Sequence, residues 1–167
     1  TARVTTDAQL VAKALYSTGP FSNTGPWPPQ AEKQTTYTIV WTVTNTSSAI
    51  SNATVSAILP AAYISWNSNI SPSNEDVVFD PESGQVTWRL GTVSSGVGYG
   101  RAPREVAFQI TLNPSISQRG DILELVGAGT LSGTDTFSSG MISATRPSLG
   151  TNITSDPAYT SQFGVVQ

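Results

Sequence analysis

The chain has 167 residues, the usual size of one domain, and this is enough to bury a core without disulfides. Charged residues make up only 11%, the net charge is −3, and 22 Thr and 22 Ser supply most of the polarity, a composition that disfavours a basic nucleic-acid binder. The chain has no Cys and no His, which excludes disulfides, Ser-His-Asp and Cys-His catalytic sites, and zinc sites that use His. No apolar run reaches the ~18 residues of a membrane span, so none is predicted.

Apolar and polar residues alternate along most of the chain, and this period of two predicts β-strands. The first predicted strand covers residues 10–16, although the Ala and Leu content of 7–16 would also suit a short helix. A long connection over 17–30 contains four prolines and two glycines within 19–29, and we expect a rigid extended segment on the surface. The clearest strand follows at 36–45.

The remaining strands are separated by turn residues. They are predicted at 53–59, 63–66, 77–79, 85–90, 104–113, 122–131 and 135–142, with a short one at 163–166. The segment 80–84 holds Pro81 and Gly84, whose backbone preferences favour a tight turn, so 77–90 is predicted to form a hairpin. This succession predicts an all-β, antiparallel β-sandwich as a single domain over 1–167, with a Pro/Gly-rich connection at 17–35.

The alternation also predicts which side chains form the core. Residues that fall in phase with the apolar face of their strands are Tyr37, Ile39, Trp41, Val55, Leu59, Trp88, Val106, Phe108, Ile110 and Leu112.

Three of these segments resemble a known family. The run from Tyr37 to Asn45, the run from Ala53 to Pro60 that ends in Leu-Pro, and the run from Gly84 to Gly91 resemble the "conserved repeat domain" of bacterial and archaeal surface proteins. The closest stretch, 36–112, is under half of the chain, and the long Pro-rich connection departs from the shorter repeats. The resemblance implies an immunoglobulin-like sandwich, usually in tandem within long extracellular proteins, and it implies no active site.

Composition and resemblance together favour a non-enzymatic structural or adhesive domain on the extracellular surface of a prokaryotic cell, without a cofactor. Its partners would be neighbouring domains or copies of the same protein, or a surface glycan. One alternative is a subunit of a self-assembling extracellular filament, in which the N-terminal strand inserts into the sheet of a neighbour. A second alternative is a carbohydrate-binding module. Because the chain opens with Thr1 rather than Met, we expect a mature or excised domain.

Two kinds of residue are candidates for ligand contact. Trp27 in the Pro-rich connection and Trp66 are not clearly in phase with a core face, so either could offer a ring for stacking, and Trp27 could equally anchor its loop. The acidic stretch 75–82 has oxygen ligands suited to Ca²⁺, but it lacks EF-hand spacing, and the simpler interpretation is a solvated turn. No metal site is therefore predicted.

Lys13 lies within an apolar segment of the first strand, where an unpaired ammonium would be costly to bury. The simpler interpretation is an edge-strand lysine that reaches solvent and discourages pairing with other chains. The alternative is an intramolecular isopeptide bond, as in some immunoglobulin-like bacterial surface domains. Its acceptor would be Asn152, and the assisting protonated acid would be Asp135 or Glu105.

Two further motifs are treated as background. The sequence has N-glycosylation motifs at Asn45, Asn52, Asn69 and Asn152, which we attribute here to the abundance of Thr and Ser. The glycine-rich run 96–100 lacks the Lys-Ser/Thr and the helix of a phosphate-binding loop, so it is interpreted as a flexible connection.

Overall fold

The computed structural model describes residues 6–167, and apart from two short 3-10 turns its regular secondary structure is all β-strand. The strands are β1 (Ala8–Leu15), β2 (Thr35–Asn45), β3 (Ile50–Ile58), β4 (Ile64–Ser71), β5 (Asp76–Asp80), β6 (Gln85–Val93), β7 (Arg104–Leu112), β8 (Glu124–Val126), β9 (Gly129–Asp135), β10 (Met141–Arg146) and β11 (Leu149–Gly150). Two short 3-10 turns, Ile116–Gln118 and Ser161–Gly164, complete the elements.

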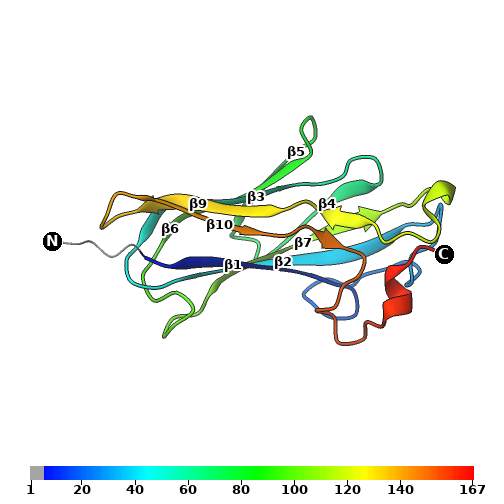
Figure 1. Ribbon diagram of the computed structural model, residues 1–167, viewed down its shortest axis with the longest axis horizontal. Coiled ribbons are helices and arrows are strands. Elements are labelled where there is room, and N and C mark those ends of the chain that lie inside the picture. Colours follow the sequence, from blue (N-terminus) through cyan, green and yellow to red (C-terminus); the bar gives the residue numbers. More distant parts are fainter. Residues whose placement is uncertain (1–5) are drawn as a thin grey trace.

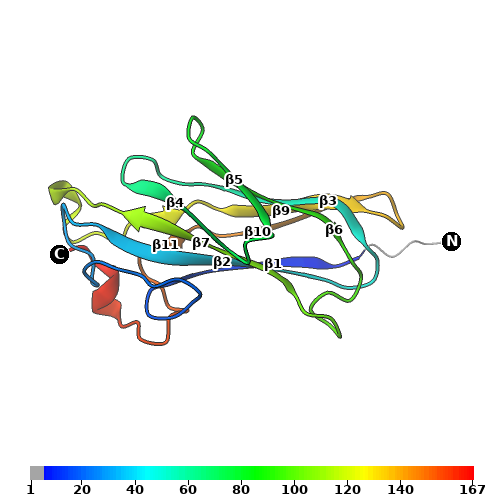
Figure 2. The ribbon, with the colours of Figure 1, turned by 180° about the vertical axis from the view of Figure 1, so that it is seen from behind.

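Two antiparallel sheets pack face to face, as Figures 1 and 2 show from opposite sides. The first sheet has the strand order β1-β2-β7-β4, and the second has the order β10-β9-β3-β6-β5. The strands β11 and β8 form a separate small ribbon. The fold is therefore the predicted all-β, antiparallel, immunoglobulin-like sandwich.

All ten predicted core side chains are at most 2% exposed, so the strand phases are confirmed. The rings of Trp41 and Phe108 meet edge to face, with centroids 5.0 Å apart. Val40 is an apolar residue on the otherwise Thr-rich face of its strand, and the structure shows why. It lies on the outer face of β2 and is buried there with Leu15 and Ala107 beneath Phe21 of the Pro-rich connection.

The strand predicted at 63–66 extends to Ser71 as β4. Three other predicted segments differ more strongly from the structure. The predicted strand 122–131 is divided at Gly127, whose N–H donates to the carbonyl of Ile58, and β8 and β9 then pair with different partners. The predicted strand 135–142 is mostly a turn. The carboxylate of Asp135 accepts hydrogen bonds from the N–H groups of Phe137 and Ser138, and such local bonds compete with a strand ladder. The predicted strand 163–166 includes part of the second 3-10 turn.

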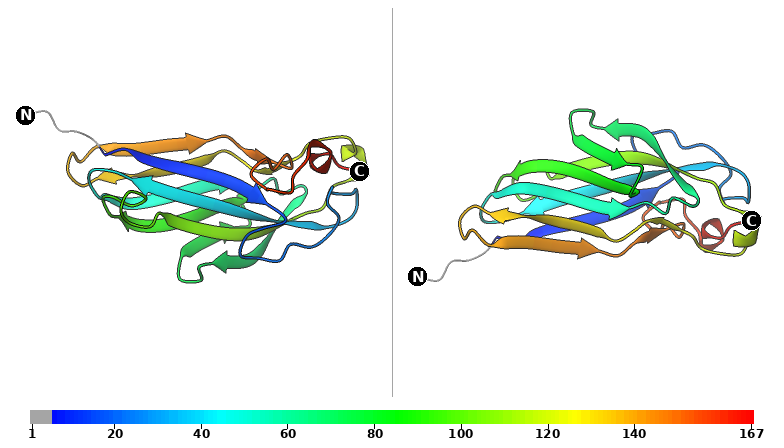
Figure 3. Two further views of the ribbon diagram at one scale, coloured as in Figure 1. Left: turned by 90° about the horizontal axis from the view of Figure 1, so that it is seen from below. Right: turned by 90° about the horizontal axis from the view of Figure 1, so that it is seen from above.

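The molecule is elongated along the direction of its strands. Figure 3 shows that the beginning of β1 and the end of the chain at Gln167 lie at opposite ends of the long axis. We call these ends the Thr6 pole and the Gln167 pole. Within residues 6–167, no helix is long and apolar enough to cross a membrane.

Candidate functional site

The beginning of β1 is held by a buried carboxylate, Asp135, at the end of β9. Its oxygens accept hydrogen bonds from the N–H of Thr6 at 2.8 Å and from the hydroxyl of Ser48 at 2.7 Å, in addition to the two turn N–H groups. The bond from Thr6 makes the largest contribution to a pKa of Asp135 well below its ordinary value, and the bond from Ser48 adds to it, against the opposing effect of burial. Asp135 is therefore a structural carboxylate that stays ionised.

Thr6 is bound from a second side as well. Its hydroxyl donates to the side-chain oxygen of Asn45 at 2.6 Å and accepts from the N–H of Ser47 at 3.0 Å. Asn45 is itself fully buried, and its amide nitrogen donates to the carbonyl of Ser48 at 2.7 Å. These bonds join the beginning of β1 to the turn between β2 and β3.

The end of β1 is held by a second carboxylate, Asp156, which lies in the C-terminal segment and is 3% exposed. One of its oxygens accepts from the N–H groups of Tyr16 and Ser17, each at 2.7 Å. The other accepts from the Ser17 hydroxyl and from the N–H of Ala158 at 2.9 Å. Burial raises the pKa of Asp156, but these hydrogen bonds outweigh it, and the net pKa is below its ordinary value.

We call Asp135 and Asp156, with the hydrogen bonds they accept, the two clamps. Between them, β1 is paired along its full length with β2. The antiparallel register runs from Ala8 opposite Asn45 to Leu15 opposite Thr38. Leu10 and Ala14 face the core, and this places Lys13 on the outer face, opposite Val40 and half-buried. The strand proposed as a donor to a neighbour thus completes the sheet of its own chain.

The structure does not bring the four candidate cross-link residues together. Lys13 lies seven residues along β1 from the Thr6 that binds Asp135, roughly 20 Å away at the rise of a strand. Asp135 also does not suit the role of a protonated acid, because its hydrogen bonds favour the carboxylate. Glu105 is exposed on β7, on the far side of β2, where it accepts a bond from Thr42 at 2.9 Å. Asn152 is exposed, without the apolar enclosure that the reaction needs.

Both tryptophans that were candidates for ligand contact are engaged within the fold. The ring of Trp27 stacks on Tyr16, with centroids 4.7 Å apart, and on Phe163, with centroids 4.4 Å apart. Trp66 stacks on Phe79 at 5.5 Å and also contacts Phe108. Trp27 therefore anchors the Pro-rich connection to the C-terminal segment, which is the second of the two roles considered for it.

Most carboxylates of the acidic stretch have partners within the fold. Glu75 accepts from the indole N–H of Trp88 at 2.8 Å and forms an ion pair with Arg104, also at 2.8 Å. Asp76 faces Arg89 at 3.8 Å, and Asp80 accepts from the Ser83 hydroxyl at 2.8 Å within its turn. Among residues 6–167, no three acidic side chains are grouped to hold a metal ion.

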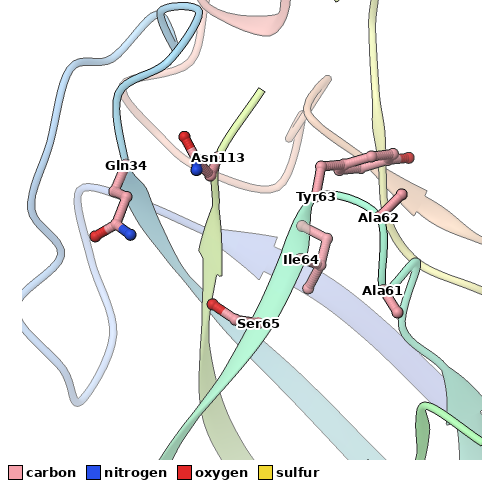
Figure 4. A pocket seen from close by; sticks show the side chains of 7 residues that line it. All are labelled: Gln34, Ala61, Ala62, Tyr63, Ile64, Ser65 and Asn113. Atoms are coloured by element: carbon pink, nitrogen blue, oxygen red, sulfur yellow. The ribbon is translucent and has the colours of Figure 1, made fainter. Parts of the chain in front are cut away.

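The surface cavities formed by residues 6–167 include two small ones. One, of about 190 Å³, lies between the segment before β2, the turn before β4 and the residue after β7, and its wall includes Gln34, Tyr63 and Asn113 (Figure 4). The other, of about 200 Å³, lies between β1 and the C-terminal segment, and Ala14, Leu149 and Asn152 contribute to its wall. Neither cavity contains a clamp residue or a candidate tryptophan.

Sequence reasoning missed Asp156 and the pairing of Glu75 with Arg104. An Asp followed by Pro in a loop is an ordinary turn signal, and nothing in its spacing indicates a partner 140 residues earlier. Asp135 was selected, but for a different chemical role. The one available signal was the low share of charged residues, 11%, because each carboxylate in such a chain is a candidate for a specific hydrogen-bond partner.

Comparisons with known proteins show the fold alone. A variant of the major pilin subunit BcpA of Bacillus cereus aligns with a TM-score of 0.51 at 11% identity, over 86% of this chain and 40% of the pilin. The full-length major pilin SpaD of Corynebacterium diphtheriae aligns with a TM-score of 0.44 at 10% identity, over 87% of this chain and 34% of that one. The C-terminal domain of the antigen I/II polypeptide BspA of Streptococcus agalactiae gives 0.40 at 8% identity, over 81% and 48% of the two chains.

No protein-family model matches the sequence, and a search of curated proteins gives no match. Membership of the "conserved repeat domain" family is therefore unsupported, whereas the sandwich that the resemblance implied is present. The chain spans well under half of the BcpA pilin, and the alignment shows that its sandwich is similar to one part of that protein.

Proposed function

We propose that this chain is a non-enzymatic structural domain of an extracellular prokaryotic surface protein, in which it transmits tension between its two poles. The observation that carries the proposal is the attachment of β1, which runs along the long axis and is clamped at its beginning by Asp135 and at its end by Asp156. The fold shared with part of a pilin subunit is in keeping with this role.

The hydrogen-bond pattern suits a load along the long axis. Bonds between antiparallel strands lie perpendicular to the strands, so a pull along β1 loads the β1–β2 bonds together rather than one after another. At the other pole, Gln167 donates its N–H to Pro29 at 2.8 Å and accepts one from Ala31 at 2.9 Å. The C-terminal end is therefore bonded to the Pro-rich connection that leads directly into β2.

The alternatives have less support from the geometry. A filament that uses a donated strand would have to release β1 from its ladder and from both clamps. A carbohydrate-binding module would need an accessible aromatic platform, and both Trp27 and Trp66 are stacked on rings of their own chain.

Single-molecule pulling tests the mechanical role, and the lack of Cys makes two-point attachment simple. A variant with Asp7→Cys and Gln167→Cys is pulled from pole to pole. A second variant with Asp7→Cys and Ser47→Cys is pulled between a residue just before β1 and a residue just after β2, both at the Thr6 pole, which opens the β1–β2 ladder from its end. We expect a higher unfolding force from pole to pole at the same loading rate. An equal or lower force would refute the proposed role.

The surface location is tested separately. An antibody against the folded domain should label intact cells of the source organism without permeabilisation. Labelling that requires permeabilised cells would exclude the extracellular location.

A further inference from the structure

The four N-glycosylation motifs are equivalent in the sequence, but in the structure their asparagines differ in exposure and in hydrogen bonding. Each has the acceptor pattern Asn-X-Ser/Thr, at Asn45, Asn52, Asn69 and Asn152. A glycosyltransferase that acts on the folded protein needs an acceptor amide nitrogen that is exposed and not held by other bonds. Exposure and hydrogen bonding therefore sort the four asparagines.

Two of the motifs are blocked. Asn45 is fully buried, and its amide nitrogen donates to the carbonyls of Ser48, Val93 and Ser94. Asn69 is exposed, but its amide nitrogen donates to the side-chain oxygen of Gln109 at 2.8 Å. In both asparagines, the nitrogen that would carry a sugar already donates hydrogen bonds within the folded chain.

Asn152 has the opposite properties. Its side chain is exposed, and among residues 6–167 no hydrogen bond engages its amide nitrogen. The N–H of Thr154 donates to the carbonyl of Asn152 at 2.9 Å, which closes a tight turn that carries the asparagine and the motif hydroxyl, and Thr154 is exposed too. The cavity of about 200 Å³ beside this turn, with Leu149 in its wall, leaves room next to the acceptor.

Asn52 is presented by a β-bulge. It lies within β3, yet it is opposite no residue of β6 or of β9, because both registers shift around it. Its φ of 52° lies in the left-handed region, which Asn tolerates better than most residues. The side chain is exposed, and bulges are a common means of turning a side chain out of a sheet.

We propose that Asn152 and Asn52 are acceptors for N-linked glycans in the folded protein, and that Asn45 and Asn69 are not. The inference rests on the extracellular location in the proposed function, because it requires contact with a glycosylation system. The donor would be an oligosaccharide on a polyprenyl pyrophosphate. The asparagine nitrogen forms a bond to C1 of the first sugar, the bond from C1 to the pyrophosphate oxygen breaks with its electron pair, and the amide proton leaves to a base of the transferase.

The test is glycosylation of the purified, folded chain. The chain is incubated with a single-subunit oligosaccharyltransferase that requires only Asn-X-Ser/Thr and with its lipid-linked oligosaccharide. We expect an intact-mass increase of two glycan units and glycopeptides at Asn152 and Asn52 alone. Thr154→Ala should abolish the product at Asn152 and leave the product at Asn52, whereas Thr154→Ser should restore it.

Short synthetic peptides that span each motif are the positive control, because each peptide presents its asparagine without a fold. Modification of the peptides together with no modification of Asn152 and Asn52 in the folded chain would overturn the inference. So would modification of Asn45 in the folded chain to the same extent as Asn152. Neither result depends on cellular location or mechanical strength, so a failure here is distinct from a failure of the proposed function.

Discussion

Asp135 and Asp156 hold the two ends of the same strand, although both lie more than 100 residues after it in the chain. Asp135 accepts the N–H of Thr6, just before β1, and Asp156 accepts the N–H groups of Tyr16 and Ser17, just after it. Each is almost completely buried and ionised. The first strand is thus secured by the last third of the sequence.

The two clamps predict a loss of stability in acid. The pKa of each carboxyl is lower in the folded than in the unfolded chain, so its contribution is complete above the unfolded pKa of about 4 and is lost as the pH falls below it. We expect the free energy of unfolding to be nearly constant from pH 6 to 8 and to fall steeply below about pH 4. Urea titrations across this range measure it. Asp135→Asn should lower the free energy of unfolding at neutral pH and make its fall below about pH 4 less steep. If this fall were as steep in Asp135→Asn as in the wild type, the role of Asp135 as an ionised clamp would be contradicted.

The Asp156 clamp can be tested by a substitution of nearly equal size. Asp156→Asn replaces a charged carboxylate that accepts four hydrogen bonds by a neutral amide, whose nitrogen cannot accept a hydrogen bond. Because bonds to a charged group contribute about 1.5–3 kcal/mol, we expect destabilisation in this range, measured by urea unfolding. Asp121→Asn is the matched control at an exposed aspartate and should change stability by less than about 0.5 kcal/mol. Equal effects of the two variants would show that the clamp contributes nothing.

Trp41 and Trp88 are the largest fully buried side chains, and Trp41 packs edge to face against Phe108. Trp41→Ala should reduce the free energy of unfolding by about 3–5 kcal/mol, because the cavity it leaves cannot collapse within two packed sheets. Tyr99→Ala, at a residue that is 57% exposed, should change it by less than about 0.5 kcal/mol. A loss below about 1 kcal/mol for Trp41→Ala would be inconsistent with the observed packing.

Removal of the first strand distinguishes a self-contained domain from a strand donor. A chain without residues 1–17 loses the full β1–β2 ladder and the bonds to both clamps, so we expect it to unfold. Circular dichroism and near-ultraviolet spectra measure the loss. A truncated chain that stays folded and soluble and binds a peptide of residues 6–17 would instead support strand exchange between copies.

For Lys13 we expect an unmodified side chain. It lies half-buried on the outer face of β1, and among residues 6–167 it has no ion pair or hydrogen bond with Asn152, Asp135 or Glu105. The intact mass should equal the value calculated from the sequence, both in the wild type and, after the substitution is allowed for, in Lys13→Ala. A wild-type mass lower by one ammonia would establish an isopeptide bond.

Much of the sandwich was predictable because burial acts on one face of each strand. Trp41, Trp88 and Phe108 were identified as core residues from phase alone, and the hairpin of β5 and β6 from its turn residues. The prediction was wrong where side chains bond to the local backbone. At Asp135 the carboxylate accepts hydrogen bonds from the next turn, which ends β9. The alternation of apolar and polar residues contains no signal for these bonds.

The sequence by itself determined the class of the fold, the strand phases and the chemistry that a chain without Cys and His cannot perform. These properties follow from local periodicity and composition, which need no knowledge of the strand order. Only the tertiary structure decided that Asp135 and Asp156 clamp β1, that Trp27 is an anchor, and that Asn152 is exposed while Asn45 is buried. The physical reason is that the partner of a polar side chain depends on which distant strands become neighbours, and a period of two carries no information about that order.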